Sequence, residues 1–470
     1  MTKNFFLEVV LVGVLLSTFS CSSTGDNQIN RNPNILIFIA DDAGVNDVGY
    51  NGSEISTPNI DRLAQEGVIL GQHYVYQFCS PTRAALLTGR PPSRFGILGP
   101  LQSDSKTRFA EGTLMLSSVL KKAGYETCLD GKWHLGMTPD QYPHHFGFDH
   151  TYGYVGPWID SYTHLVGNFR GDGSGIRQWH RNGELFEEHG HVTDLITAEA
   201  IDFITTRRDK SKPFFLYVAY SAPHVPCQEP KKYTNPYEGV IENNSRLFFA
   251  ASMTHLDESM GEIVGTLKEE GIENNTLVIF MSDNGGQKGA DFGATGSGWL
   301  IPPDEYNMAY ALSDQLGDNA PLRAWKGTVY EGGIRVPAFV SWPGHLKPAR
   351  IEEPVHVCDW LPTLAGLAGI GVPGEMNAEG MDVLPILQGR ELGTPRYLYW
   401  RGFRQQAVRK GPWKLIHSVK NNEPGEGTYE LFNLDLDPNE KVNLAERYPE
   451  MVSEFSAEIE RNMKMDLEPE

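Results

Sequence analysis

The sequence predicts an α/β fold with a large, mostly parallel or mixed central sheet flanked by helices, followed by a small C-terminal antiparallel sheet with one helix. Apolar runs of strand length occupy residues 34–40, 213–220 and 277–281, and each run ends in polar residues. Such runs are typical of strands buried on both faces of a sheet. Helical patterns lie between the runs, and this alternation favours a parallel sheet.

Three segments carry the clearest helical patterns. Segment 57–67 starts with Thr-Pro and ends with Gly, which predicts a helix with a threonine N-cap, a proline at its first position and a glycine stop. Apolar residues at helical spacing predict two further helices, over residues 192–206 and 246–269. These helices are expected to cover the two faces of the central sheet.

The pattern changes after residue 374. Short aromatic-rich segments, separated by turn residues, predict four antiparallel strands and a closing helix. The segments are Tyr397–Trp400, Gln406–Arg409, Trp413–Ile416 and Tyr429–Phe432, with the helix from Tyr448.

The chain of 470 residues exceeds one average domain of ~100–200 residues. We therefore expect a catalytic domain over residues 34–374 and a C-terminal subdomain over residues 375–470.

The N-terminus has the pattern of an export signal over residues 1–20, with Lys3, an apolar stretch and then small residues. The stretch is too short to span a bilayer. Residues 18–21 resemble the lipobox of bacterial lipoproteins, which implies lipidation of Cys21, a tether over residues 21–33, and a periplasmic, outer-membrane or cell-surface location. Membrane contact is then expected only through this anchor. The alternative is an ordinary cleaved signal with an incidental cysteine.

The formal net charge of −20 argues against a nucleic-acid partner, because proteins that bind phosphate backbones carry a basic surplus. Basic residues gathered in a pocket would work against the overall field of the protein, so each of them is informative. The five cysteines are too few and too scattered for a disulfide framework.

The most specific motif starts at Cys79 and continues to Arg90. Ser80 is a good N-cap and Pro81 suits the first helical position, so we expect Cys79 just before a helix N-terminus. The free backbone N–H groups and the helix dipole suit an anion at that point. Arg83, in the first turn, can fold back toward the same point.

Cys79, Pro81 and Arg83, followed by Thr88-Gly89, resemble the signature of the type I sulfatases, the formylglycine-dependent branch of the alkaline phosphatase superfamily. The resemblance implies that Cys79 is oxidised to formylglycine by a formylglycine-generating or anaerobic sulfatase-maturating enzyme. One hydroxyl of the hydrated aldehyde would attack sulfur, and the other would later expel sulfate. Cys79 as a buried thiol, or as an unrelated thiol nucleophile, is the alternative.

Two pairs of oxygen ligands follow two of the apolar runs: Asp41 with Asp42, and Asp283 with Asn284. Such pairs after a strand are more often caps or solvated turns, but both match metal positions of the sulfatases. The resemblance therefore implies one Ca²⁺ per active site, with formylglycine at Cys79 as a further ligand; hard oxygen donors suit calcium.

The remaining catalytic positions are two lysines and two histidines. Taken singly, such residues are usually solvated or structural. Residues 124–134 resemble the second sulfatase signature, which implies that Lys132 binds sulfate and that His134 holds the formylglycine hydroxyl and acts as a base. His224 matches the histidine that protonates the leaving oxygen, and Lys326 matches the second sulfate-binding lysine. With Arg83 they would gather positive charge around one sulfate group.

Segments between residues 124 and 154 are similar to arylsulfatase B-like enzymes, which remove 4-O-sulfate from N-acetylgalactosamine. Bacterial relatives of that type act on carrageenans or on chondroitin and dermatan sulfate, so a sulfated oligo- or polysaccharide carrying 4-O-sulfate on galactose or N-acetylgalactosamine is the expected substrate. Sugar contacts are expected within residues 158–179, with His164 and Arg177 as candidates.

Two other functions remain open at this point. A phosphatase or phosphodiesterase of the same superfamily uses a Ser or Thr nucleophile and two transition metals with histidine ligands, whereas this chain offers Cys79 and one evident metal cluster. A non-catalytic protein that binds sulfated glycans would be expected to lack at least one catalytic residue, and all of them are present.

Overall fold

The computed structural model describes residues 32–166, 175–288, 316–391, 393–419 and 427–469. The predicted export signal, Cys21 and most of the predicted tether lie outside the described residues. Within them, no helix combines the length and the hydropathy that crossing a membrane requires.

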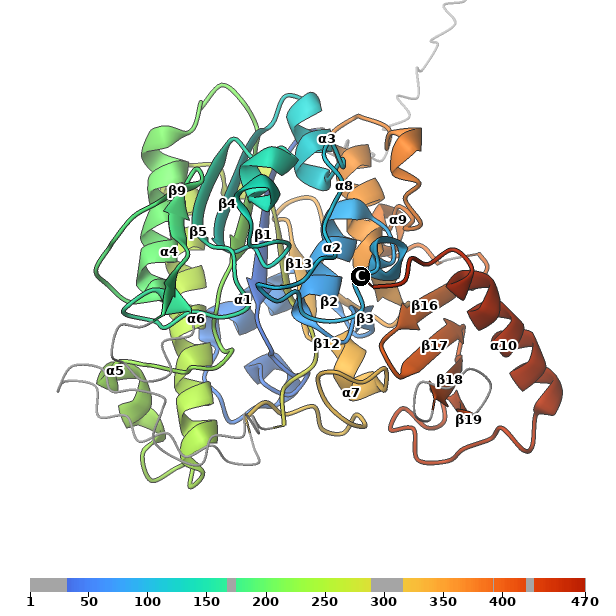
Figure 1. Ribbon diagram of the computed structural model, residues 1–470. Helices are drawn as coiled ribbons and strands as arrows, with labels where there is room; N and C mark the ends of the chain where they lie inside the picture. Colours follow the sequence, from blue (N-terminus) through green and yellow to red (C-terminus); the bar gives the residue numbers. More distant parts are fainter. Residues whose placement is uncertain (1–31, 167–174, 289–315, 392, 420–426, 470) are drawn as a thin grey trace, which may run out of the picture.

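A mixed sheet of ten strands forms the centre of the molecule, as predicted (Figure 1). Its five middle strands are parallel to one another, and antiparallel pairs occur toward both edges. In sheet order the strands are β14 (Ala349–Ile351), β2 (Val68–Leu70), β13 (Ala338–Ser341), β11 (Thr276–Ser282), β1 (Asn34–Ala40), β10 (Phe214–Ala219), β4 (Glu126–Lys132), β5 (His150–Tyr154), β8 (Trp179–Arg181) and β9 (Glu184–Leu185).

The apolar runs form the middle of this sheet because both of its faces are covered. Along β1, Ile35, Ile37 and Ile39 belong to one core cluster, while Leu36 and Phe38 belong to the cluster on the other face. A strand buried on both sides needs apolar residues at every position rather than at every second one. The three predicted strands are therefore confirmed, and β1 has the predicted bounds.

Helices cover the two faces as separate layers (Figure 1). One layer contains α1 (Pro58–Glu66), α4 (Val192–Asp202) and α6 (Asn244–Glu269), and the other contains α2 (Cys79–Thr88), α3 (Leu116–Lys122) and α8 (Trp360–Leu367). The three predicted helices are present, although α4 gives way to a π-helical turn at Phe203–Arg207. Thr57 occupies the N-cap position of α1, but its side chain does not cap the helix.

The predicted C-terminal sheet consists of β16 (Tyr397–Arg401), β17 (Gln405–Lys410), β18 (Trp413–Val419) and β19 (Gly427–Asn433), all antiparallel, with α10 (Pro449–Met463) packed against it. Trp400 Nε1 donates to the carbonyl oxygen of Val75 at 2.8 Å, which fastens this sheet to the main body. The domain boundary at residue 374 stays a prediction.

Short elements complete the fold. Two small sheets are formed by β12 (Arg335–Val336), β3 (His73–Tyr74) and β15 (Val355–His356), and by β6 (Leu165–Val166) with β7 (Ile176–Arg177). The short helices are α5 (Lys231–Thr234), α7 (Glu331–Ile334) and α9 (Leu384–Leu387).

Candidate active site

The parallel strands bring polar residues together at their carboxyl ends, where open α/β sheets place their sites. Asp41 follows β1 and Asp283 follows β11, two neighbouring strands of the sheet. Cys79 begins α2 beside them. Ligand atoms of these three residues all lie within 4.8 Å of one another, and all three side chains are buried.

Cys79 is the first residue of α2, and Phe78 is the N-cap. The expectation that Ser80 caps the helix was therefore wrong. The Ser80 hydroxyl lies within the first turn and accepts a hydrogen bond from the backbone N–H of Leu101 at 3.0 Å, so it attaches a neighbouring loop instead. Burial raises the pKa of the Cys79 thiol, which disfavours the thiolate that a cysteine nucleophile needs.

Arg83 connects three elements from within the buried helix α2. Its Nε and Nη2 atoms donate to Asp283 Oδ2 at 3.0 and 2.7 Å, and its Nη1 donates to the carbonyl oxygen of Lys132 at 2.9 Å. The side chain is 1% exposed. A guanidinium held by a carboxylate and a backbone carbonyl has a fixed geometry, which is a requirement for preorganised charge.

Two lysines pair with the acidic residues that follow β1. Lys132, at the end of β4, contacts Asp41, and Lys326 Nζ donates to Asp42 Oδ1 at 2.5 Å. Burial by itself would lower the pKa of Lys132, but the negative charge of Asp41 raises it above the ordinary value. Burial would likewise lower the pKa of Lys326, but the charge of Asp42 raises it, so both lysines are ammonium ions at neutral pH.

Two histidines each present one ring nitrogen to the same region. His134 Nε2 lies 3.0 Å from the carbonyl oxygen of Leu101, and its buried Nδ1 has no hydrogen-bond partner among the described residues. His224 Nδ1 lies 2.5 Å from the carbonyl oxygen of Val225, and its Nε2 lies 3.7 Å from Asp42 Oδ2. A carbonyl oxygen can only accept a hydrogen bond, so in each histidine the ring nitrogen that faces the carbonyl carries the proton. Burial, followed by the charge of Lys326, lowers the pKa of His224 to about 4.

Two of these residues have a strained backbone. Asp42 has φ +76° and His134 has φ +55°. A left-handed conformation costs a non-glycine residue roughly 1–3 kcal/mol, and such residues concentrate at functional sites.

Two buried oxygen atoms suggest a place for a cation. Asp41 Oδ1 and Asn284 Oδ1 have no hydrogen-bond partner among the described residues, although Asn284 Nδ2 donates to Asp42 Oδ1 at 2.7 Å. Burial, followed by the charge of Asp41, raises the pKa of Asp283. Unpartnered oxygens beside crowded carboxylates fit a hard divalent cation, and this donor set, made of oxygen atoms, fits calcium better than zinc.

A cavity of about 380 Å³ opens above this group. Its lining residues combine the catalytic positions with aromatic and polar side chains: Phe78, Cys79, Pro100, Gln102, His134, Pro157, Trp158, His224, Gln287, Lys288, Trp325 and Lys326. Its volume is typical of a site for a small molecule.

Comparison with known proteins identifies the family. A family model described as "Sulfatase" matches residues 33–370, more than half of the chain. This chain belongs to the sulfatase family. A second model, "N-sulphoglucosamine sulphohydrolase, C-terminal", matches residues 325–467. The protein is accordingly a sulfuric ester hydrolase of the type I, alkaline phosphatase-like group.

Two curated sulfatases and one solved structure illustrate what the chain is similar to. The sulfatase is 32% identical to arylsulfatase J of Mus musculus, over 90% of this chain and 74% of that protein. It is also 32% identical to N-acetylgalactosamine-6-sulfatase of Mus musculus, over 81% of this chain and 71% of that protein. The crystal structure of Ps i-CgsB in complex with k-i-k-neocarrahexaose is 31% identical, with a TM-score of 0.79 over 93% of this chain and 94% of that chain.

The structure brings together ten of the twelve predicted site residues. The ten are Asp41, Asp42, Cys79, Arg83, Lys132, His134, His224, Asp283, Asn284 and Lys326. His164 and Arg177 do not line the cavity. His164 is buried and stacks on Trp179 with ring centroids 4.6 Å apart, and Arg177 pairs with Glu187. Their predicted roles in sugar binding stay predictions.

Seven of the cavity-lining residues were not singled out from the sequence: Phe78, Pro100, Gln102, Pro157, Gln287, Lys288 and Trp325. Phe78 directly precedes Cys79 and Trp325 directly precedes Lys326, so adjacency to a motif was the available signal. Trp158, by contrast, lies within the region expected to contact sugars.

Proposed function

We propose that this sulfatase removes 4-O-sulfate from galactose or N-acetylgalactosamine units of a sulfated polysaccharide, with formylglycine at position 79 and one Ca²⁺. The observation that supports it best is the gathering of Arg83, Lys132 and Lys326 around buried Cys79 in a protein of net charge −20. Each of these cations is paired with Asp283, Asp41 or Asp42, so a bound Ca²⁺ would give the site a net positive charge that fits a small anion.

Asp41, Asp42, Asp283 and Asn284 are the residues that would hold calcium. When bound, the ion supplies positive charge that polarises a sulfate oxygen. The unpartnered Oδ1 atoms of Asp41 and Asn284 support this assignment, because a buried oxygen without a partner is costly.

The cationic side chains stabilise the charge that spreads over the sulfate oxygens during reaction. Lys326 lines the cavity, whereas Lys132 is completely buried behind it. Because ion pairs and a backbone carbonyl fix Arg83 and Lys132, little reorganisation is needed when substrate binds.

Two histidines move protons at defined atoms. Formylglycine at position 79 would supply the nucleophilic hydroxyl, and His134, through its unpartnered Nδ1, would accept the proton of the remaining hydroxyl as sulfate is released. His224 Nε2 donates a proton to the departing sugar oxygen, while Val225 holds the opposite nitrogen. A bound sulfate between His224 and Lys326 would oppose the lowering of the His224 pKa and favour its protonated form.

The cavity walls support a sugar substrate. Trp158 and Trp325 add aromatic surface, and Lys288 adds an exposed cation. One relative is named N-acetylgalactosamine-6-sulfatase and another was crystallised in complex with k-i-k-neocarrahexaose, which supports a sulfated sugar as the substrate. The 4-O position is supported by the similarity of residues 124–154 to arylsulfatase B-like enzymes.

Desulfation mapped by NMR tests this proposal. Protein coexpressed with a formylglycine-generating enzyme is incubated with carrageenan, chondroitin 4-sulfate, chondroitin 6-sulfate and dermatan sulfate oligosaccharides. We expect loss of sulfate from C4 of the galactose-type unit. Loss from C6 alone would overturn the proposed position, and no desulfation of any of the four would overturn the proposed class of sugar.

We also propose that the protein is exported and anchored through a lipid on Cys21. The basis is the N-terminal sequence alone. Cell fractionation of the full chain tests it: Cys21→Ala is expected to move the protein from the membrane fraction to the soluble periplasmic fraction. Equal membrane association of both forms would contradict the anchor.

A further inference from the structure

The segment that carries His224 follows β10 and continues to Pro230 without forming a helix or strand. Most of its residues are buried. Among the described residues, His224 hydrogen-bonds within this segment, to the carbonyl oxygens of Val225 and Ser221, and outside the segment its Nε2 faces Asp42 Oδ2 at 3.7 Å. The position of His224 therefore depends on what fixes the rest of the segment.

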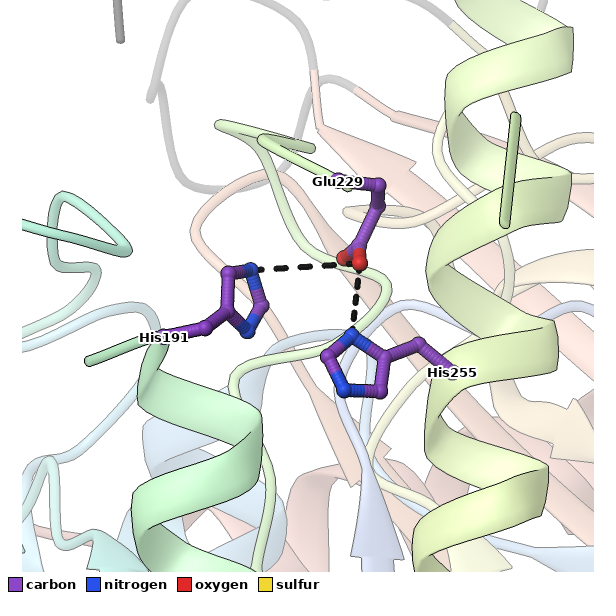
Figure 2. Close-up of side chains that lie close together, drawn as sticks. All are labelled: His191, Glu229 and His255. Carbon is purple, nitrogen blue, oxygen red and sulfur yellow. Dashed lines mark hydrogen bonds and ion pairs between the residues drawn. The ribbon is translucent and has the colours of Figure 1, made fainter. Parts of the chain in front are cut away.

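The far end of the segment is fixed by a buried cluster (Figure 2). Glu229 Oε2 accepts a hydrogen bond from Nδ1 of His255, in the middle of α6, at 2.7 Å. His255 Nε2 donates to Asp194 Oδ1, in the first turn of α4, at 2.9 Å. His191, at the N-cap of α4, also faces Glu229, with its Nε2 3.8 Å from Oε2.

The cluster contains a protonated histidine, His255, between the carboxylates of Glu229 and Asp194. Burial by itself would lower the pKa of His255, but Glu229 and Asp194 raise it to about 9. Burial by itself would raise the pKa of Glu229, but the facing rings of His191 and His255 hold it below its ordinary value. An imidazolium thus lies between two carboxylates, and its ring stacks on Tyr233 with centroids 4.1 Å apart. Removing one partner of such a buried pair is strongly unfavourable.

The protons of this cluster favour hydrogen bonding over metal binding. Ligand atoms of His191, Glu229 and His255 do lie within 4.8 Å of one another. However, His191 Nδ1 accepts from the backbone N–H of Thr193 at 3.2 Å, and His191 Nε2 donates to the carbonyl oxygen of Gln228 at 2.8 Å. Both nitrogens of His255 face carboxylates. Neither ring offers a free lone pair.

The neighbouring residue Gln228 ties the same segment to the cavity wall. Its Nε2 donates to Asp160 Oδ2 at 2.9 Å, and its Oε1 accepts from the backbone N–H of Ser161 at 2.7 Å. Trp158, which lines the cavity, lies two residues before Asp160. The two adjacent residues Gln228 and Glu229 therefore join the His224 segment to α4, α6 and the Trp158 wall.

We propose that the buried Glu229–His255 pair positions His224 for its role as the leaving-group acid, so that Glu229 and His255 are positioning residues. The proposal rests on the function proposed above for His224. Without the pair, the segment has fewer fixed contacts, and His224 Nε2 is placed correctly for a smaller part of the time. Only reactions that need the acid are then slowed.

Two substrates separate this role from general destabilisation. An aryl sulfate with a good leaving group, such as 4-nitrophenyl sulfate, does not need the acid, whereas a sulfated sugar does. For Glu229→Gln we expect kcat/KM to fall roughly 10-fold on the sugar sulfate and to stay within about 2-fold on the aryl sulfate. Glu238→Gln, which changes an exposed glutamate after the same segment, is the matched control and should leave both unchanged.

A double-mutant cycle tests whether Glu229 acts through His224. In the His224→Ala background, Glu229→Gln should cause no further loss on the sugar sulfate. Losses that add, or equal losses on both substrates in a folded protein, would overturn the proposal. Stoichiometric zinc that disappears in His255→Gln would also overturn it and would show a metal site instead.

A milder variant covers the case in which Glu229→Gln does not fold. Asp194 is exposed, so Asp194→Asn should be tolerated and should give a smaller loss restricted to the sugar sulfate. No loss on the sugar sulfate, or an equal loss on both substrates, would contradict the proposal. If His224→Ala itself slows both substrates equally, the assignment of His224 as the acid fails, which is distinguishable from failure of the pair alone.

Discussion

The floor and the rim of the catalytic cavity differ in how their side chains are held. On the floor, Asp41 and Lys132 are completely buried, and Arg83 is 1% exposed. Each of them contacts an opposite charge or a backbone carbonyl. At the rim, Trp158 and Trp325 are half-buried, and Lys288 is exposed.

This difference separates chemistry from recognition. Fixed charges on the floor suit the sulfate group, which is common to every substrate of the family, because preorganised groups stabilise developing charge without moving. Under the proposed function, the rim would contact the rest of the substrate, which differs among sulfatases. Changes on the floor should therefore abolish turnover, whereas changes at the rim should alter affinity for the sugar.

Removal of calcium is expected to have the largest effect. Chelation by EGTA should abolish sulfate release and lower Tm, because Asp41 and Asp283 would then lie close together without the cation. Binding at 100-fold excess over Kd stabilises a fold by about 2.7 kcal/mol. Turnover and differential scanning fluorimetry are the measurements. Recovery with Ca²⁺ is the control, and full activity after complete chelation would contradict a calcium site.

Lys326→Ala removes the floor lysine that lines the cavity directly. Loss of a cation that contacts sulfate should lower kcat/KM roughly 10²–10³-fold on sugar and aryl sulfates alike, because both carry the same group. Lys347→Ala removes an exposed lysine and serves as the matched control. An effect confined to the sugar sulfate would assign Lys326 to sugar recognition instead.

Trp325→Ala tests the rim and should have a smaller effect. Loss of one aromatic wall is expected to raise KM for the sugar sulfate about 5–10-fold, corresponding to ~1–1.4 kcal/mol, with little change in kcat. Steady-state kinetics with oligosaccharides and with 4-nitrophenyl sulfate provide the comparison. A large fall in kcat on both substrates would place Trp325 with the floor.

The floor was predictable from sequence because its residues follow recognisable local patterns. Asp41 and Asp283 end buried apolar runs, and Cys79 begins a helix with a characteristic motif. The C-terminal sheet was predictable for a similar reason, since its aromatic segments are separated by turn residues. In such places local sequence and tertiary structure agree.

The rim and the Glu229–His255 pair were not predictable in this way. Glu229 and His255 come from separate segments that no repeat or spacing relates, and they meet only through the packing of α6 against the His224 segment. His164 was named only as a candidate for sugar contact, and nothing in its local sequence indicated that the fold buries it against Trp179. Serine is a residue type that favours the N-cap position, but the Ser80 hydroxyl instead accepts a hydrogen bond from the backbone N–H of Leu101.

The central claim is that the nucleophile derives from Cys79. Peptide mass spectrometry of preparations made with and without a formylglycine-generating enzyme measures the converted fraction directly, and sulfate release is measured on the same samples. We predict that activity is proportional to the converted fraction and that Cys79→Ala folds but is inactive. Full activity in protein with unmodified Cys79 would contradict this account.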